Sequence, residues 1–262
     1  MTQPQWSSLY IQHPGGRETI AIGLTSALET AGAAKYDPFG LMPGQSYPRA
    51  VKLFVAPAVG TWVRLIPSPD CFLEPIVSAV SSAVMLLIAE IDADLAPSLA
   101  VYKDGVRVDT MSALAPMVSE PEAFSKLLRA PRTGAAGIGG ISSGALPANV
   151  RAMSGGLPTR QVERLMNSMT GALGKSERAN AQAALQSVDW GSGAGAWMRE
   201  VLAFLGLDTH TALDYATIST AVRTAKRLIR NPQAMLYPGD AEARDAVPDA
   251  LDYLPIFYGW KA

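Results

Sequence analysis

The stretch that decides the fold is residues 76–110, IVSAVSSAVMLLIAEIDADLAPSLAVYKDGVRVDT, which holds the longest apolar run in the chain and its clearest turn signal. Residues 75–83 alternate small and apolar side chains at helical spacing, and Pro75 suits the first turn of a helix. Residues 84–91 are a continuous aliphatic run, which is typical of a strand covered on both faces. We therefore expect a helix followed by a buried strand.

A β-hairpin is predicted at the end of the same stretch. Residues 99–103 and 106–109 alternate apolar and polar side chains, and Asp104 and Gly105 separate them. A two-residue Asp-Gly loop needs φ > 0 at both positions, which Asp tolerates and Gly adopts freely. Residues 84–109 should therefore form three antiparallel strands with a helix on one face.

The chain before this stretch repeats the same order of elements. Residues 7–12 read as a strand, and residues 17–31 have the spacing of an amphipathic helix that stops at Gly32. Residues 51–55 and 61–66 then read as two strands. The order helix, strand, strand thus occurs twice, which suggests a duplicated unit. It predicts an α+β fold with one antiparallel sheet and two helices on the same face.

The second half of the chain has a different composition and is predicted to be mostly helical. Residues 120–128 predict a short helix, and the Gly/Ala/Ser-rich residues after it predict a linker or mobile loop. Further helices are predicted over 160–173, 176–185, 197–205 and 211–230. The predicted division is an α+β sheet domain over 1–130, the linker over 131–158, and a helical region with an aromatic tail over 159–262.

Composition excludes several classes of protein. The net charge is −1, so the whole chain has no bulk attraction to nucleic acid or to anionic membranes. The single cysteine, Cys71, excludes an internal disulfide framework. Residues 76–89 are uncharged but too short to span a bilayer, which takes about 20 apolar residues. The N-terminus does not have the pattern of a secretory signal, so a cytoplasmic protein is expected.

Two catalytic motifs lack the context that they need. Ser142 lies in a G-x-S-x-G sequence, and Asp189 and His210 follow in the order of a hydrolase triad. That motif requires a strand before the serine and a helix after it, whereas Gly and Ala precede it and Pro147 follows. Residues 174–176, Gly-Lys-Ser, resemble the end of a phosphate-binding loop, but the required upstream glycine and strand are missing.

Metal binding has one weak candidate. Glu90, Asp92 and Asp94 alternate, so they would share one side of a strand and could hold Mg²⁺ or Ca²⁺. Such a row is more often the solvated end of a strand. A zinc site would have to recruit carboxylates, because the chain has one cysteine and only two histidines, His13 and His210. No cofactor is expected.

Two groups of residues are candidates for contact with a partner. Arg223, Lys226, Arg227 and Arg230 share one face of the predicted helix 211–230. They could contact phosphates, although a solvated face is the commoner outcome. The aromatic tail, which includes Tyr258 and Trp260, could form an exposed docking patch, although packing against the sheet domain is favoured.

Three segments together, residues 54–57, 61–64 and 101–105, resemble a type of uncharacterised bacterial protein. In those proteins a tryptophan strand precedes a helix, an aliphatic strand and a hairpin of the Y-x-D-G kind. The resemblance carries no catalytic motif and implies no active site.

The sequence therefore predicts a non-catalytic binding module, with a protein or small ligand held in a cleft between the sheet and the C-terminal helices. One alternative is a hydrolase-type enzyme that uses Ser142 or the carboxylates of Glu90, Asp92 and Asp94. A second is a weak nucleic-acid binder that uses Arg223–Arg230. The sequence does not predict the identity of the partner or the oligomeric state.

Overall fold

The computed structural model describes residues 4–37, 47, 49–81, 85–92, 94–130, 188–191 and 193–260. Contacts within the chain divide it into two compact units. The first comprises Met1–Trp6, Ala89–Ser98 and Met111–Thr209, and the second comprises Ser7–Ile88, Leu99–Thr110 and His210–Ala262. The predicted linker lies outside the described residues, so the division at 130 and 158 stays a prediction.

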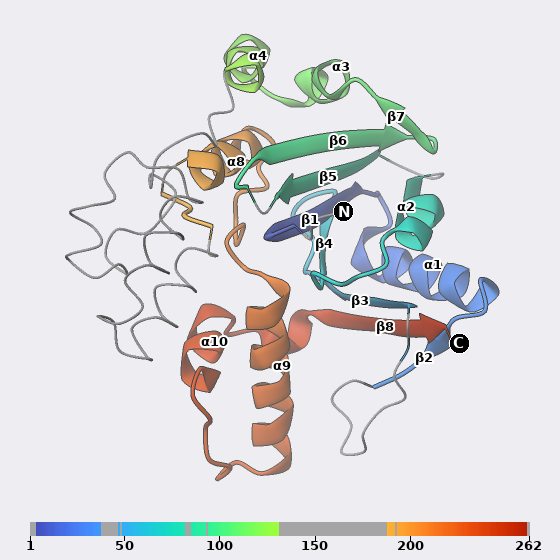
Figure 1. Cartoon of the computed structure of the whole chain (residues 1–262), viewed down its shortest axis with the longest axis vertical. Coiled ribbons are helices and arrows are strands. Elements are labelled where there is room, and N and C mark those ends of the chain that lie inside the picture. The colour runs from blue at the N-terminus through green and yellow to red at the C-terminus, as the bar shows by residue number, and fades with distance from the viewer. Residues whose placement is uncertain are drawn as a thin grey trace, which may run out of the picture. The chain divides into compact units, whose positions relative to one another are not determined.

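The α+β fold class is confirmed, and one antiparallel sheet is its centre (Figure 1). Its spatial order is β2-β8-β3-β4-β1-β5-β6-β7. The strands are β1 (Trp6–Gln12), β2 (Ala34–Lys35), β3 (Arg49–Val55), β4 (Trp62–Pro67), β5 (Met85–Ile91), β6 (Pro97–Lys103), β7 (Val106–Val108) and β8 (Leu254–Trp260). The predicted strands 7–12, 51–55, 61–66 and 84–91 correspond closely to β1, β3, β4 and β5.

The α-helices of the described residues are α1 (Gly16–Thr30), α2 (Glu74–Ser81), α3 (Thr110–Leu114), α4 (Pro121–Arg129), α8 (Gly193–Phe204), α9 (Tyr215–Arg230) and α10 (Asp240–Ala246). Five of these described helices, α1, α2, α4, α8 and α9, correspond to predicted helices, whereas α3 and α10 were not predicted. Gly32 follows α1 with φ +79° and Gly206 follows α8 with φ +67°, as expected of helix stops. The predicted helices 160–173 and 176–185 lie outside the described residues. None of the helices in the described part of the chain has the length and apolar character to cross a bilayer.

The predicted hairpin is confirmed. β6 and β7 pair antiparallel, with Val101 opposite Val108 and Lys103 opposite Val106. Asp104 has φ 50° and Gly105 has φ 78°, which are the positive angles that a two-residue hairpin loop requires.

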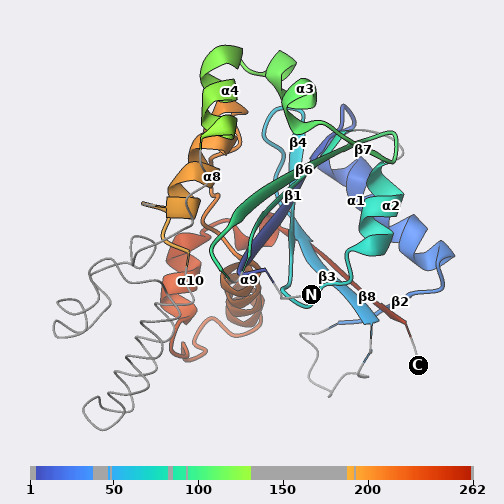
Figure 2. The same cartoon turned by 45° about the horizontal axis from the view of Figure 1, so that its top comes forward.

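Helices cover both faces of the sheet in the second unit (Figures 1 and 2). The predicted pair, α1 and α2, lies on one face, where Leu24 and Ile76 join a core that includes Leu53. On the opposite face α9 and α10 pack on Phe54 and its neighbours. Leu53 and Phe54 enter different cores because successive strand residues point to opposite faces.

The aromatic tail is part of the sheet and not, as the sequence predicted, an appendage of the helical region. It is the strand β8, which pairs with β3 over its whole length, from Arg49 opposite Trp260 to Val55 opposite Leu254. The tail was expected to pack against the surface of the domain, because large aromatic side chains are usually buried. β2 pairs with β8 at Tyr258 and Gly259, and the Tyr36 N–H donates to the Phe257 carbonyl. Within the described residues Pro255 lies beyond the end of this pairing, so a missing N–H is tolerated there.

The helices of the first unit pack through aromatic side chains. The rings of Phe124 in α4 and Phe204 in α8 have centroids 5.5 Å apart. The indole Nε1 of Trp197 donates a hydrogen bond to the carbonyl of Leu127 at 3.1 Å. One apolar and one polar contact therefore join α4 to α8.

Two helical glycines should respond oppositely to alanine. A Cβ on Gly23 of α1 would meet nothing within 4 Å, whereas one on Gly195 of α8 would meet the backbone of Asp189 and lie 2.9 Å from Val188 Cγ1. Gly23→Ala should raise the free energy of unfolding by about 0.5–1 kcal/mol, because alanine loses less backbone entropy in a helix. Gly195→Ala should lower it, since backbone must move. Denaturant titration measures both, and equal shifts would contradict the described packing around Gly195.

Candidate functional site

The helix α9 separates an apolar face from a basic face. Ile218, Ala221 and Val222 are buried against the sheet. The four basic residues are three, four and seven positions apart, so they share a second side of the helix. Asp214 caps the helix by accepting a hydrogen bond from the Thr217 N–H at 2.8 Å. The helix therefore begins at Tyr215, four residues after the predicted start at position 211.

The four predicted interaction residues differ in exposure. Arg223 and Arg230 are exposed, whereas Lys226 and Arg227 are half-buried. No Asp or Glu occurs in the sequence from Tyr215 to Gly239. The end of α9 and the loop after it therefore form a locally cationic segment in a chain of net charge −1.

Exposed apolar side chains gather at the same place. Ile229 is 65% exposed, and the loop after α9 exposes Met235 (78%), Leu236 (38%) and Tyr237 (59%). These are four of the eight large hydrophobic residues that are exposed in the described part of the chain. The loop joins the lower ends of α9 and α10 in Figure 1. We call Arg223, Ile229, Arg230 and residues 235–237 the hairpin tip.

A buried carboxylate fixes the loop from inside. Asp240 has a side chain that is 2% exposed, forms an ion pair with Arg227, and accepts hydrogen bonds from the Thr224 hydroxyl at 2.8 Å and the Tyr237 N–H at 2.7 Å. The Tyr237 N–H, followed by Arg227 and Thr224, lowers the pKa of Asp240 to about 2. The Arg227 guanidinium also lies 4.5 Å from the centre of the Tyr237 ring. Arg227 therefore binds residues of the loop and is not part of the outer cationic surface.

A second buried charge anchors the segment before α9. Arg64 on β4 is 7% exposed and donates from Nε to the Ser8 hydroxyl at 2.9 Å. Its terminal nitrogens donate to the carbonyls of His210 at 2.5 Å, Thr211 at 3.2 Å and Leu213 at 2.7 Å. This role was not predicted from the sequence, although an arginine inside the apolar strand 61–66 is a signal for it. The arrangement is a structural clamp, since these hydrogen bonds tie β4 to β1 and to the backbone of the segment before α9.

The lone cysteine lies in a polar cluster near the end of β4. Lys52 forms an ion pair with Asp70, whose carboxylate also accepts a hydrogen bond from Ser68 at 2.7 Å. Burial raises the pKa of the Cys71 thiol to about 12 and that of Tyr36 to about 12. A protonated thiol is a poor nucleophile, so Cys71 is not activated for covalent catalysis.

The hydrolase alternative gains no support from its described members. Ser142 and the Gly-Lys-Ser sequence at 174–176 lie outside the described residues. Asp189 accepts a hydrogen bond from the Gly191 N–H at 2.8 Å, which is a local turn. His210 is exposed, and its carbonyl binds Arg64. The triad therefore stays an untested prediction.

The acidic row ends a strand and shapes a turn. Glu90 lies in β5, and the Asp92 carboxylate after it accepts hydrogen bonds from the N–H groups of Asp94 at 2.9 Å and Ala96 at 2.8 Å. These bonds stabilise the connection between β5 and β6. In the described part of the chain no three His, Cys, Asp or Glu side chains are grouped to hold a metal ion.

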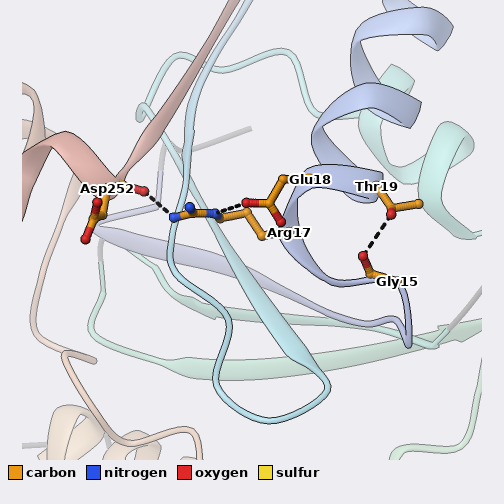
Figure 3. Close-up of polar contacts among 5 residues, drawn as sticks. All are labelled: Gly15, Arg17, Glu18, Thr19 and Asp252. Carbon is orange, nitrogen blue, oxygen red and sulfur yellow. Dashed lines mark hydrogen bonds and ion pairs between the residues drawn. The ribbon is translucent and has the colours of Figure 1, made fainter.

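Hydrogen bonds and an ion pair hold the start of α1 in place, as Figure 3 shows. The Thr19 hydroxyl donates to the Gly15 carbonyl at 2.8 Å, and Arg17 donates to the Asp252 carbonyl at 2.6 Å and pairs with Glu18 at 3.0 Å. His13 Nδ1 accepts the Gly15 N–H at 2.8 Å. These contacts give the histidine a structural role in the turn.

The two aromatic candidates for docking are held within the fold. Tyr258 is 2% exposed, and its hydroxyl donates to Glu29 of α1 at 2.9 Å. Trp260 is half-buried, and its Nε1 donates to the Ala31 carbonyl at 2.9 Å. Both side chains therefore join β8 to α1, which leaves the hairpin tip as the candidate surface.

The chain was compared with protein families, curated proteins and solved structures. No protein-family model, curated protein sequence or solved structure matches the chain significantly.

Proposed function

We propose that the protein is a non-catalytic binding module whose binding surface is the hairpin tip. The observation that carries the proposal is that exposed apolar side chains and exposed cations occur together on one segment without a carboxylate. Such patches on a folded protein usually mark an interaction site. The described side chains where α9 and α10 meet the sheet are buried and apolar, so we place the binding surface on the outer end of the hairpin.

The chemistry of the tip defines the partner in general terms. Arg223 and Arg230 favour a negatively charged partner, and Met235 and Leu236 favour one that also offers an apolar phase or surface. The Asp240 network holds the loop in one conformation before binding, so little ordering entropy is lost on contact.

A small anionic probe with an apolar body, anilinonaphthalene sulfonate, tests the proposal. The folded chain should enhance its fluorescence saturably, and the enhancement should weaken with salt, because screening acts on exposed charges. Met235→Ser with Leu236→Ser, and separately Arg223→Gln with Arg230→Gln, should each weaken probe binding about 5-fold or more.

The matched control is Val106→Ser with Arg107→Gln in the β6–β7 hairpin, where an exposed apolar residue and an exposed cation also adjoin. It should bind the probe like the unmodified chain. Equal binding by all three variants would show that the probe binds elsewhere and would contradict the proposal.

A further inference from the structure

We infer that the partner of the hairpin tip is an anionic lipid bilayer. Met235 and Leu236 enter the acyl-chain boundary, and Arg223 and Arg230 meet the headgroups. This inference rests on the proposed binding function and names the partner of the same surface. It concerns attachment to a membrane surface and requires no spanning helix.

The exposure of the apolar side chains favours a lipid bilayer as the partner. Met235 is 78% exposed and Ile229 65%, so these side chains project from the end of the helical hairpin. Apolar groups that project in this way bind membranes in proportion to the apolar area that they bury at the headgroup boundary. Tyr237, which is 59% exposed, has a ring and a hydroxyl, and tyrosine is enriched at the membrane interface.

The charges match the same partner. Arg223 and Arg230 are seven positions apart, so they share one face of the last two turns of α9, which lead into the apolar loop. Long cationic side chains lay their stems along apolar surface while the charged ends reach the headgroups. The Asp240 carboxylate is buried and paired with Arg227, so it does not repel an anionic surface. The first exposed carboxylate after the loop belongs to Glu242 of α10.

Nucleic acid fits the tip less well. Phosphates reward cations, and unpaired bases reward exposed aromatic faces. The tip instead exposes aliphatic side chains, and the Arg227 guanidinium covers its one aromatic ring, that of Tyr237, at 4.5 Å. Exposed methionine, leucine and isoleucine gain nothing from a phosphate backbone.

Co-sedimentation with lipid vesicles tests the inference on the full chain. Vesicles of phosphatidylglycerol mixed with phosphatidylcholine should bind the protein. Pure phosphatidylcholine should bind it about 30-fold more weakly, because each of the two arginines near an anionic surface contributes about 5-fold. Arg223→Gln with Arg230→Gln should lower partitioning about 30-fold. Met235→Ser with Leu236→Ser should lower it by at least about 10-fold. Val106→Ser with Arg107→Gln is the control and should partition normally.

The outcomes separate this inference from the proposed function. Vesicle binding that depends on anionic lipid and on both halves of the tip supports the inference. Failure to bind vesicles, together with tip-dependent binding of anilinonaphthalene sulfonate, overturns the bilayer and leaves the binding function. Failure of both overturns the function as well. Tighter, tip-dependent binding to duplex DNA than to vesicles also overturns the bilayer. Circular dichroism confirms that each variant is folded, and the lipid comparison on the unmodified chain needs no variant.

Discussion

Replacing Arg64 with methionine is expected to lower the free energy of unfolding by about 3–5 kcal/mol. Methionine fills much of the same space but donates no hydrogen bond, so the carbonyls of His210, Thr211 and Leu213 lose their shared donor. A buried acceptor without a partner costs about 1–3 kcal/mol. Denaturant titration followed by circular dichroism measures the change.

The geometry of the guanidinium, and not only its charge, should account for this effect. Arg64→Lys keeps the charge but replaces a planar fork with a single ammonium, so it should recover less than half of the loss. Hydrogen exchange of the amides in residues 210–213 should accelerate in both variants. Arg107→Met, on the exposed β7, is the matched control and should change stability by no more than about 0.5 kcal/mol. A loss below about 1 kcal/mol for Arg64→Met would refute the clamp.

Replacing Asp240 with asparagine should lower the free energy of unfolding by about 2 kcal/mol at neutral pH. Asparagine retains the shape of aspartate, but Arg227 loses its counter-charge and the hydrogen bonds from Thr224 and Tyr237 lose their charged acceptor. The loop that carries residues 235–237 should become mobile at the same time. The expected loss is smaller than that for Arg64 because Arg227 is partly exposed, at 24%, and water solvates it.

The effect of Asp240 should depend on pH with a definite sign. The pKa of Asp240 is lowered from 3.8 to about 2 in the folded chain, so the carboxylate contributes stability above the unfolded value. That contribution should be lost as the pH falls from about 4 to about 2, and the difference between the two proteins should shrink over this window. Unfolding curves at several pH values measure it. Asp245→Asn removes an exposed charge beside Arg244 and should show little difference at any pH. A constant difference across the window would contradict the network.

Local pattern was sufficient for much of the fold. The Asp-Gly pair predicted the β6–β7 hairpin because a two-residue loop requires positive φ at both positions, and Asp104 and Gly105 have it. The spacing of Ile20, Leu24 and Leu28 predicted α1, and all three are buried. These signals lie within one element, so no distant residue has to be known.

Long-range pairing was beyond the same reasoning. Leu53 lies opposite Ile256, and nothing within β8 indicates that β3 is its neighbour. A proline is disfavoured inside a central strand, because it has no N–H to donate. Only the structure shows that position 255 lies beyond the pairing with β2. Similarly, the three arginines and the lysine of α9 read as four equivalent cations in the sequence, whereas the ion pair with Asp240 removes Arg227 from the outer surface.

The sequence by itself determined the α+β class and the positions of most described helices and strands, because periodicity and turn chemistry act over a few residues. Only the tertiary structure decided which charges are buried and which are exposed. Arg64 and Arg230 are both arginines. Arg64 donates hydrogen bonds to backbone carbonyls inside the fold, whereas Arg230 faces solvent. The physical reason is that burial and hydrogen-bond partners depend on segments brought together across the sheet, and these are distant along the chain.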